Sequence, residues 1–255
     1  MAQYQDVFAR YEEKYLLEEP VYRKIREALD TYAEPDRYGQ AFISNLYYDT
    51  PNHRLIRASL EKPVYKEKLR LRSYGVLESQ SQVFIELKKK YEGIVYKRRI
   101  AMPLSEAEAY LRRSWSNAGR PAASQIEREI SWTLAYYRDL RPEMYLSYDR
   151  LAFCGREDPS LRITFDSNLR FREEELDLRA GDRGEELLPP GMRLMEVKLP
   201  GSMPLWLAHL LDDCRLIPAT FSKYGRAYEK ARLFREAEEP SRKDEKQKKG
   251  GVNCA

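Results

Sequence analysis

Apolar and polar residues alternate with a period of two through most of the chain, a pattern that predicts β-strands with two different faces. The segments that carry it are 8–17, 41–48, 64–73, 83–90, 94–102, 144–153, 160–171 and 193–199. The short turn at 91–93 makes the fourth and fifth segments a hairpin. We therefore predict about eight strands, most of them antiparallel.

Helical periodicity falls between these segments, at 20–32, 103–115, 125–137, 204–214 and 222–236. Pro20 lies near the first turn of its segment, and Ser105 is a candidate cap before acidic residues. Residues 240–255 show no periodicity, so we predict a single domain over 1–239 and a disordered basic tail. Antiparallel strands with short helices predict an α+β fold, either a sandwich or a closed barrel.

Composition narrows the function classes only slightly. With 255 residues and 42% hydrophobic content the chain can bury a sizeable core. A net charge of +4 does not by itself require a polyanionic partner, so the positions of the charges matter more. The 3 cysteines are widely spaced and the 2 histidines lie far apart, which argues against a disulfide scaffold and a zinc site. No apolar stretch resembles a signal peptide or a membrane span, and we expect a cytoplasmic protein.

Charged residues gather on one face of the predicted strands. In the segment 64–73 four cations share a face, and the other strands place further charges in the same way. The groups are Lys66, Lys68, Arg70 and Arg72; Glu86, Lys88 and Lys90; Lys97 and Arg99; Tyr148 and Arg150; Arg162, Thr164 and Asp166; and Glu196 and Lys198. Like charges in register destabilise a sheet unless an anion lies between them.

A carboxylate, a spacer and a lysine recur as Glu12-x-Lys14, Glu86-x-Lys88 and Glu196-x-Lys198. On a strand this spacing puts both side chains on one face, about 7 Å apart. Carboxylates beside a bound polyanion are unfavourable unless a divalent metal bridges them to it. Two interpretations follow: an ordinary sheet with one solvated face, or a barrel whose charged lumen binds a metal–polyphosphate complex.

Nine short motifs, in order along residues 8–234, resemble the VTC domain of polyphosphate polymerases. This is the catalytic domain of the vacuolar transporter chaperone complex and of free-standing bacterial relatives. The motifs are RYEEKYL at 10–16, NLYYDTP at 45–51, KLRLRSYG at 68–75, IELKK at 85–89, GIVYKRR at 93–99, YDRLAF at 148–153, LRITFDSNL at 161–169, MEVKL at 195–199 and FSKYG at 221–225. Each motif is weak by itself, and their shared order carries the resemblance.

The resemblance implies the triphosphate tunnel fold, a closed antiparallel barrel of eight strands with flanking helices. It further implies that the lumen binds a tripolyphosphate with Mn²⁺ or Mg²⁺, and that the γ-phosphoryl group of ATP is transferred to a growing inorganic polyphosphate chain. By the same resemblance, catalytic cations are expected at Lys14, Arg70, Arg72, Lys88, Arg150 and Arg162. Substrate-binding residues are expected at Tyr148, Ser222 and Lys223. Strand parity, by which alternate residues of a strand lie on the same face, adds Lys68, Lys97, Arg99 and Lys198. Metal ligands are expected at Glu196 and, as a candidate, Glu12.

One departure bears on the reaction. Tunnel triphosphatases and their cyclase relatives carry Glu-x-Glu-x-Lys on the first strand, whereas this chain has Arg10-x-Glu12-x-Lys14. Loss of the first carboxylate favours the polymerase branch and leaves Glu12 as either a metal ligand or an ion-pair partner. Tyr47 and Tyr48 are interpreted as packing residues, and Asp49 as a cap or turn residue.

Three functions therefore remain open. They are a polyphosphate polymerase, a tunnel hydrolase that cleaves inorganic or nucleoside triphosphate, and a non-catalytic module that binds polyphosphate or inositol phosphates. Nucleic acid is not expected as a partner, because the cations alternate along strands instead of lining a helix face or an aromatic stripe. Eukaryotic members of the family work with membrane segments, so a membrane-protein partner is compatible with the resemblance.

Overall fold

The computed structural model describes residues 7–8, 11–75, 77–78, 80–92, 94–113 and 124–249. The strands run β1 Val7–Phe8, β2 Tyr11–Leu17, β3 Ala33–Asp49, β4 Tyr65–Tyr74, β5 Gln82–Tyr91, β6 Ile94–Pro103, β7 Arg141–Gly155, β8 Arg162–Arg172, β9 Glu185–Glu186 and β10 Arg193–Leu199. The helices run α1 Glu19–Tyr32, α2 Arg54–Leu60, α3 Leu104–Arg113, α4 Gln125–Tyr137, α5 Leu205–Asp213 and α6 Lys223–Lys249. All eight predicted strand segments are thus occupied by strands.

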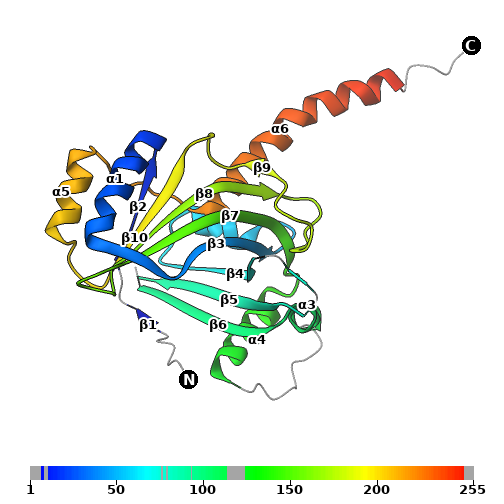
Figure 1. Cartoon of the computed structure of the whole chain (residues 1–255). Helices are drawn as coiled ribbons and strands as arrows, with labels where there is room; N and C mark the ends of the chain where they lie inside the picture. Colours follow the sequence, from blue (N-terminus) through cyan, green and yellow to red (C-terminus); the bar gives the residue numbers. More distant parts are fainter. Residues whose placement is uncertain are drawn as a thin grey trace, which may run out of the picture.

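The strands form one antiparallel sheet in the order β1-β6-β5-β4-β3-β7-β8-β10-β2, with β9 beside β8 (Figure 1). The prediction of a closed eight-stranded barrel is wrong in two respects: in the described residues the sheet has ten strands, and it is not closed. Both extra strands, β1 and β9, contain two residues. The first predicted strand is divided, because β1 pairs with β6 whereas β2 pairs with β10. The two strands at the ends of this order, β1 and β2, are therefore neighbours in sequence. In the described part of the chain, however, no ladder of backbone hydrogen bonds joins them.

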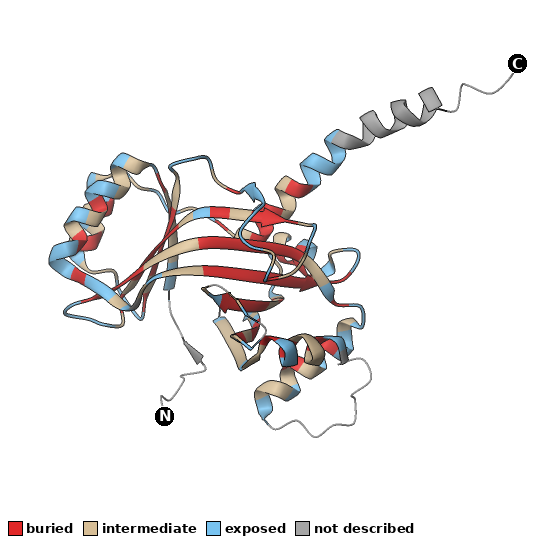
Figure 2. Ribbon diagram, turned by 45° about the vertical axis from the view of Figure 1, so that its right-hand side comes forward, coloured by how far each residue is buried: buried red, intermediate tan, exposed pale blue. Residues whose placement is uncertain are grey.

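Two apolar cores lie on the outer face of the sheet. Helices α3 and α4 cover the outer face of β3 to β6, where Ile85 and Leu87 are fully buried against Leu104 and Ile130. Helices α1 and α5 cover β2, β10, β8 and β7, and pack Ile25 and Leu207 against alternate residues of those strands. Figure 2 shows buried residues along the strands and exposed residues on the outer sides of α1 and α5. Period-two alternation on the strands and helical periodicity on the covering helices create these cores.

A third apolar core fills one end of the opposite, inner face, under α2 and α6. Asp49 joins the two helices to the sheet: its carboxylate accepts hydrogen bonds from the Leu55 and Ile56 backbone N–H groups of α2 at 2.8 and 2.9 Å, and from the Tyr224 hydroxyl of α6 at 3.0 Å. The interpretation of Asp49 as a capping residue is confirmed. At Gly225 a Cβ atom would lie 3.1 Å from Leu60 Cδ2, so the absence of a side chain lets α6 approach α2 closely.

Beyond this core α6 extends away from the body of the protein (Figure 1). The helix continues to Lys249 and so includes residues 240–249 of the segment predicted to be a disordered tail, whereas 250–255 lie outside the described residues. In the part of the chain that the structure describes, no helix is both long enough and apolar enough to cross a membrane.

Candidate functional site: a charged inner face

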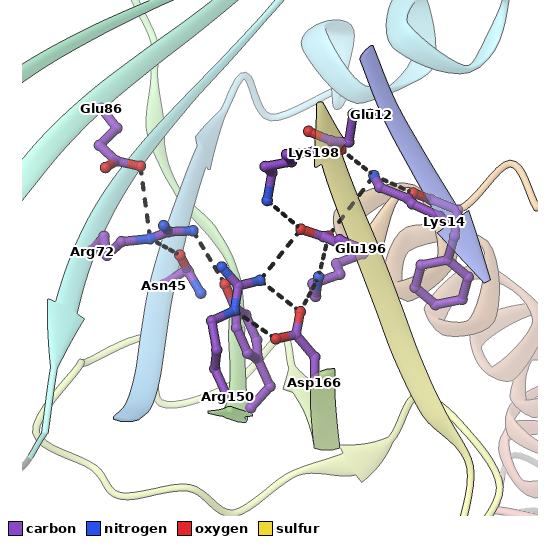
Figure 3. Close-up of polar contacts among 12 residues, drawn as sticks. Glu12, Lys14, Asn45, Arg72, Glu86, Arg150, Asp166, Glu196 and Lys198 are labelled. Carbon is purple, nitrogen blue, oxygen red and sulfur yellow. Dashed lines mark hydrogen bonds and ion pairs between the residues drawn. The ribbon is translucent and has the colours of Figure 1, made fainter. Parts of the chain in front are cut away.

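The residues expected at the site lie on the inner face of the sheet or at the start of α6. Strand parity places them there: cross-strand partners such as Arg70 and Glu86, or Lys14 and Glu196, point to the same side. Ser222 lies directly before α6, and its hydroxyl oxygen accepts the Gly225 backbone N–H at 3.1 Å. The third apolar core occupies one part of this inner face, and Figure 3 shows charged side chains such as Arg72, Arg150 and Glu196 on another part.

One group of charges centres on Glu86, which is 1% exposed. We call it the Glu86 cluster; its cations are Arg70, Arg72, Lys97 and Arg99. Arg70 donates to Glu86 Oε2 through Nε at 2.9 Å and Nη2 at 2.7 Å, while Arg99 and Lys97 each approach Oε1 to 2.8 Å. Burial alone would raise the pKa of Glu86, but the four cations outweigh it and hold that pKa well below its usual range. One carboxylate thus holds four cations in place, and positive charge predominates.

A second group, the Glu196 cluster, contains three carboxylates and four cations. Its members are Glu12, Asp166 and Glu196 with Lys14, Arg150, Lys198 and Lys223. Lys198 lies 2.9 Å from Glu196 Oε2, and Lys223 lies 2.8 Å from Glu196 Oε1. Figure 3 shows Glu196 at the centre of contacts that arrive from several strands. The cations Lys198, Lys223, Arg150 and Lys14 overcome the effect of burial and hold the pKa of Glu196 well below its usual range.

Asp166 and Glu12 complete the Glu196 cluster. Arg150 makes a forked contact with Asp166, at 2.6 Å from Nε and 2.7 Å from Nη2, and Lys223 lies 2.6 Å from the same carboxylate. Lys14 lies 3.0 Å from Glu12 and 4.0 Å from Glu196. Burial opposes ionisation of Glu12, yet Lys88, Lys198 and Lys14 lower its pKa to about 2. All three carboxylates of this cluster are therefore ionised at neutral pH.

Lys68 and Lys88 belong to neither cluster. They are direct cross-strand partners, and in the described part of the chain neither lies within ion-pair distance of a carboxylate. Lys68 donates to Ser222 Oγ at 2.8 Å. Burial and the nearby Lys88 charge lower the pKa of Lys68 to about 7. Of the three Glu-x-Lys units, those of β2 and β10 are internal ion pairs, whereas in β5 Glu86 binds other cations and Lys88 has no ion pair among the described residues.

Arg162 lies directly across from Lys198 in the register of β8 and β10, but it forms its ion pair outside both clusters. Its guanidinium binds Asp36 of β3 and is 39% exposed, so it lies at the margin of the inner face. Strand parity was correct for Arg162, but it does not show which carboxylate a side chain contacts.

Sequence reasoning missed several polar residues of the inner face. Tyr47 accepts a hydrogen bond from Arg70 Nη1 at 3.0 Å and stacks on Tyr224, with ring centroids 4.4 Å apart. Arg70 and Arg72 outweigh burial and lower the pKa of Tyr47. Asn45 accepts from Arg72 Nε at 2.9 Å. Parity on β3 gave the only available signal, because it puts Asn45 and Tyr47 on one side and Tyr48 on the other, in the outer core.

The donor set of the Glu196 cluster fits a divalent cation that is completed by substrate. Mg²⁺ and Mn²⁺ are typically bound by one or two carboxylates plus phosphate oxygens. Directly across from Glu196 lies Thr164, whose buried hydroxyl oxygen has no hydrogen-bond partner among the described residues. In the same described ranges no group of three or more His, Cys, Asp or Glu residues is placed so that it could hold a metal ion by itself. Glu196, with Glu12 or Asp166 nearby, is the best candidate ligand.

Comparisons with known proteins place this architecture in a family. The model of the VTC domain matches residues 9–232. The subunit 4 of the vacuolar transporter chaperone complex from Trypanosoma brucei brucei is 31% identical over 239 residues, which cover 77% of this chain and 30% of that protein. The protein of the same name from Schizosaccharomyces pombe is 28% identical over 225 residues, 72% of this chain and 31% of the relative. The chain therefore spans less than a third of the curated relatives that it matches.

Solved structures support the fold. A protein from Bacillus halodurans that is predicted to be an adenylate cyclase superposes with a TM-score of 0.52 at 14% identity, over 86% of this chain and 96% of that one. A similarly named protein from Vibrio parahaemolyticus gives a TM-score of 0.50 at 14% identity, over 87% and 98%. At this identity the likeness concerns the fold alone. Because the family model covers most of its length, this chain belongs to the VTC domain family.

Proposed function

We propose that the charged inner face transfers the terminal phosphoryl group of ATP to an inorganic polyphosphate chain. The observation that carries the proposal is the division of charge between the Glu86 cluster, with four cations to one carboxylate, and the Glu196 cluster, with four cations to three. Arginine forks suit phosphate oxygens, and carboxylates suit a divalent cation. Membership of the VTC family supports phosphoryl transfer as the reaction class.

In the proposed reaction a terminal oxygen of the polyphosphate attacks the γ-phosphorus of ATP. The bond from that phosphorus to the β,γ-bridging oxygen breaks, and ADP leaves with the bonding electron pair. No protein nucleophile is needed, so the residues act by position and charge. A divalent cation held by Glu196 would neutralise phosphate charge when it is bound.

The chain's own side chains supply the remaining stabilisation. Arg70 and Arg72 point at the inner face with fixed orientations, because Glu86, Tyr47 and Asn45 accept their hydrogen bonds. Such preorganised donors stabilise charge that develops on the transferred group without a cost of reorganisation during the reaction. Lys223, the first residue of α6, and Ser222, directly before it, add donors at the helix N-terminus, where the helix dipole also favours an anion.

The named relatives are subunits of a complex and extend well beyond the matched region. We therefore also propose that this chain works with a protein partner, for which a membrane protein is the candidate. Cytoplasmic location, ATP and Mn²⁺ or Mg²⁺ belong to the same proposal.

The test is to incubate the protein with ATP, Mn²⁺ and a short polyphosphate primer and to separate the products on a gel. The wild type should extend the primer, whereas Glu196→Gln and Arg70→Ala should lower the rate by about a hundredfold or more. Matched controls are Glu185→Gln and Arg23→Ala, which remove a charge from exposed positions outside both clusters.

The other two functions give different results. Release of phosphate without longer chains would show a tunnel hydrolase. If no reaction occurs while tripolyphosphate binds equally well to the wild type and Glu196→Gln, the protein is a phosphate-binding module, and the proposed activity is wrong. The same assay without a divalent cation tests the metal requirement.

A further inference from the structure

Four lysines on the inner face differ from the other cations there because they have no carboxylate partner. They are Lys66, Lys68, Lys88 and Lys90, and we call them the lysine patch. The cations of the Glu86 and Glu196 clusters, and Arg162, each lie within 4.0 Å of an Asp or Glu oxygen. In the described ranges no such contact exists for the four lysines. Glu12 acts on Lys88 from beyond ion-pair distance, whereas the charges that act on Lys66 are those of Lys90 and Lys62.

The register of β4 and β5 fixes how the patch is arranged. Lys68 lies directly across from Lys88, and Lys66 lies directly across from Lys90. The two pairs are two residues apart on each strand, which places them on the same face about 7 Å apart. Like charges that face each other on neighbouring strands destabilise a sheet. Two successive lysine pairs therefore carry a cost that a bound anion would remove.

The patch leads from the clusters to the end of the β4–β5 pair. Lys68 and Lys88 lie beside Lys14, whose charge adds to the field at Lys68 and at Lys88. Lys66 and Lys90 lie toward the end where Tyr65 pairs with Tyr91, and Lys90 is exposed. Lys62 contributes to the field at Lys66 and is exposed in the preceding loop. Positive charge is thus continuous from the inner face to the rim.

Of the outer pair, Lys66 and Lys90, only Lys66 makes a side-chain hydrogen bond within the described residues. Lys66 donates to the Ser59 carbonyl oxygen of α2 at 3.3 Å, a contact typical of a cation near a helix C-terminus. No such contact involves Lys90 in the described residues. Two facing lysines at a rim, one of which has no protein partner, are better suited to an anion than to the stability of the fold.

We infer that the outer pair of the lysine patch, Lys66 and Lys90, binds the part of a polyphosphate chain that extends beyond the phosphates held by the two clusters and by the inner pair, Lys68 and Lys88, and that this outer pair marks where the chain reaches the rim. The inference rests on the proposed function and adds the path by which the polyphosphate chain leaves the inner face. Polyphosphate is a chain of repeated anionic groups, and a row of lysines can bind it without a fixed geometry. Lysine carries a point charge on a flexible side chain, whereas arginine presents a rigid fork of donors. A ligand of three phosphates would be held by the clusters and would not need the outer pair.

The test compares two ligands and two double variants. Lys66→Gln/Lys90→Gln removes the outer pair, and Lys24→Gln/Arg232→Gln removes two exposed charges elsewhere as the matched control. We expect the outer variant to bind tripolyphosphate within about twofold of wild type and long-chain polyphosphate about tenfold more weakly, as two lost lysine–phosphate contacts suggest. Salt should weaken binding of the long chain less steeply in this variant than in wild type.

Lys66→Arg/Lys90→Arg keeps the charge and should restore the affinity for the long chain, while thermal unfolding shows whether each variant is folded. Equal loss for both ligands would place the outer pair in the triphosphate site, and no loss for either would make the patch an ordinary solvated surface. A single-stranded DNA that binds as tightly and depends equally on the pair would show a general polyanion surface. Each of these results contradicts the inference alone, whereas a wild type that binds neither phosphate ligand contradicts the proposed function as well.

Discussion

The Glu86 cluster and the Glu196 cluster use the same residue types but differ in their balance of charge. In the first, one buried carboxylate holds four cations. In the second, Glu196 and Asp166 share Arg150 and Lys223, and Glu12 adds a third carboxylate. The first is therefore suited to an anion and the second to an anion together with a divalent cation. The comparison shows that one sheet face can separate the two roles through the placement of a few carboxylates.

Removal of each central carboxylate should affect stability unequally, and this is the largest effect we expect. Glu86→Gln leaves four partly buried cations without a counter-charge, so unfolding should become easier by about 3 kcal/mol. Glu196→Gln should cost about 1 kcal/mol, because Asp166 still binds Arg150 and Lys223. Urea unfolding of both variants measures the difference.

Tripolyphosphate should then stabilise Glu86→Gln more than it stabilises the wild type, since the ligand supplies the missing negative charge to the native state only. Equal loss of stability in the two variants would show that the clusters do not differ in the way described here.

The pH dependence of binding should come from two lysines, Lys68 outside both clusters and Lys97 in the Glu86 cluster. Burial and the nearby Lys88 charge lower the pKa of Lys68 to about 7, and burial outweighs Glu86 and lowers the pKa of Lys97 to about 7. A bound phosphate favours the charged lysine and so raises each pKa. Binding then takes up a proton above pH 7, and affinity falls as the pH rises. Between pH 6 and pH 8 the affinity for tripolyphosphate should fall up to about tenfold through each of these two groups.

Calorimetry at several pH values, in buffers of different ionisation enthalpy, measures both the affinity and the proton uptake. Lys68→Arg should flatten part of the profile and Lys68→Arg/Lys97→Arg the rest, because arginine stays charged throughout this range. Lys223 behaves differently: Asp166 and Glu196 raise its pKa despite its burial. A profile that is unchanged in Lys68→Arg would assign the titration to another group.

The smallest effect concerns two adjacent tyrosines. Tyr47→Phe removes a hydroxyl that accepts a hydrogen bond from Arg70 in the Glu86 cluster, so the affinity for tripolyphosphate should fall by about 1 kcal/mol, or roughly fivefold. Tyr48→Phe is the natural control, because Tyr48 packs in the outer core with α3 and α4. Isothermal titration of both variants gives the comparison, and an equal effect of the two changes would argue against a role of Tyr47 in orienting Arg70.

Strand parity carried most of the sequence prediction. All eight predicted strand segments are present, and the side on which Arg70, Glu86 and Glu196 lie follows from alternation alone. The division of the first strand could not be predicted in this way, because alternation through 8–17 is the same whether a strand pairs along its whole length or changes its neighbour. The prediction of a closed barrel failed at that point.

Sequence by itself determined the residue types of the inner face, their parity and the resemblance to the VTC family, because these depend on local spacing and order along the chain. Only the tertiary structure decided how the charges pair, since pairing depends on register between strands that are distant in sequence. It brought Asp166 and Lys223 to Glu196, directed Arg162 to Asp36, and placed Lys68 and Lys88 across from each other with no carboxylate of the described residues within ion-pair distance. Electrostatic energy depends on distances in space, and these are set when the sheet curls and α6 packs against it.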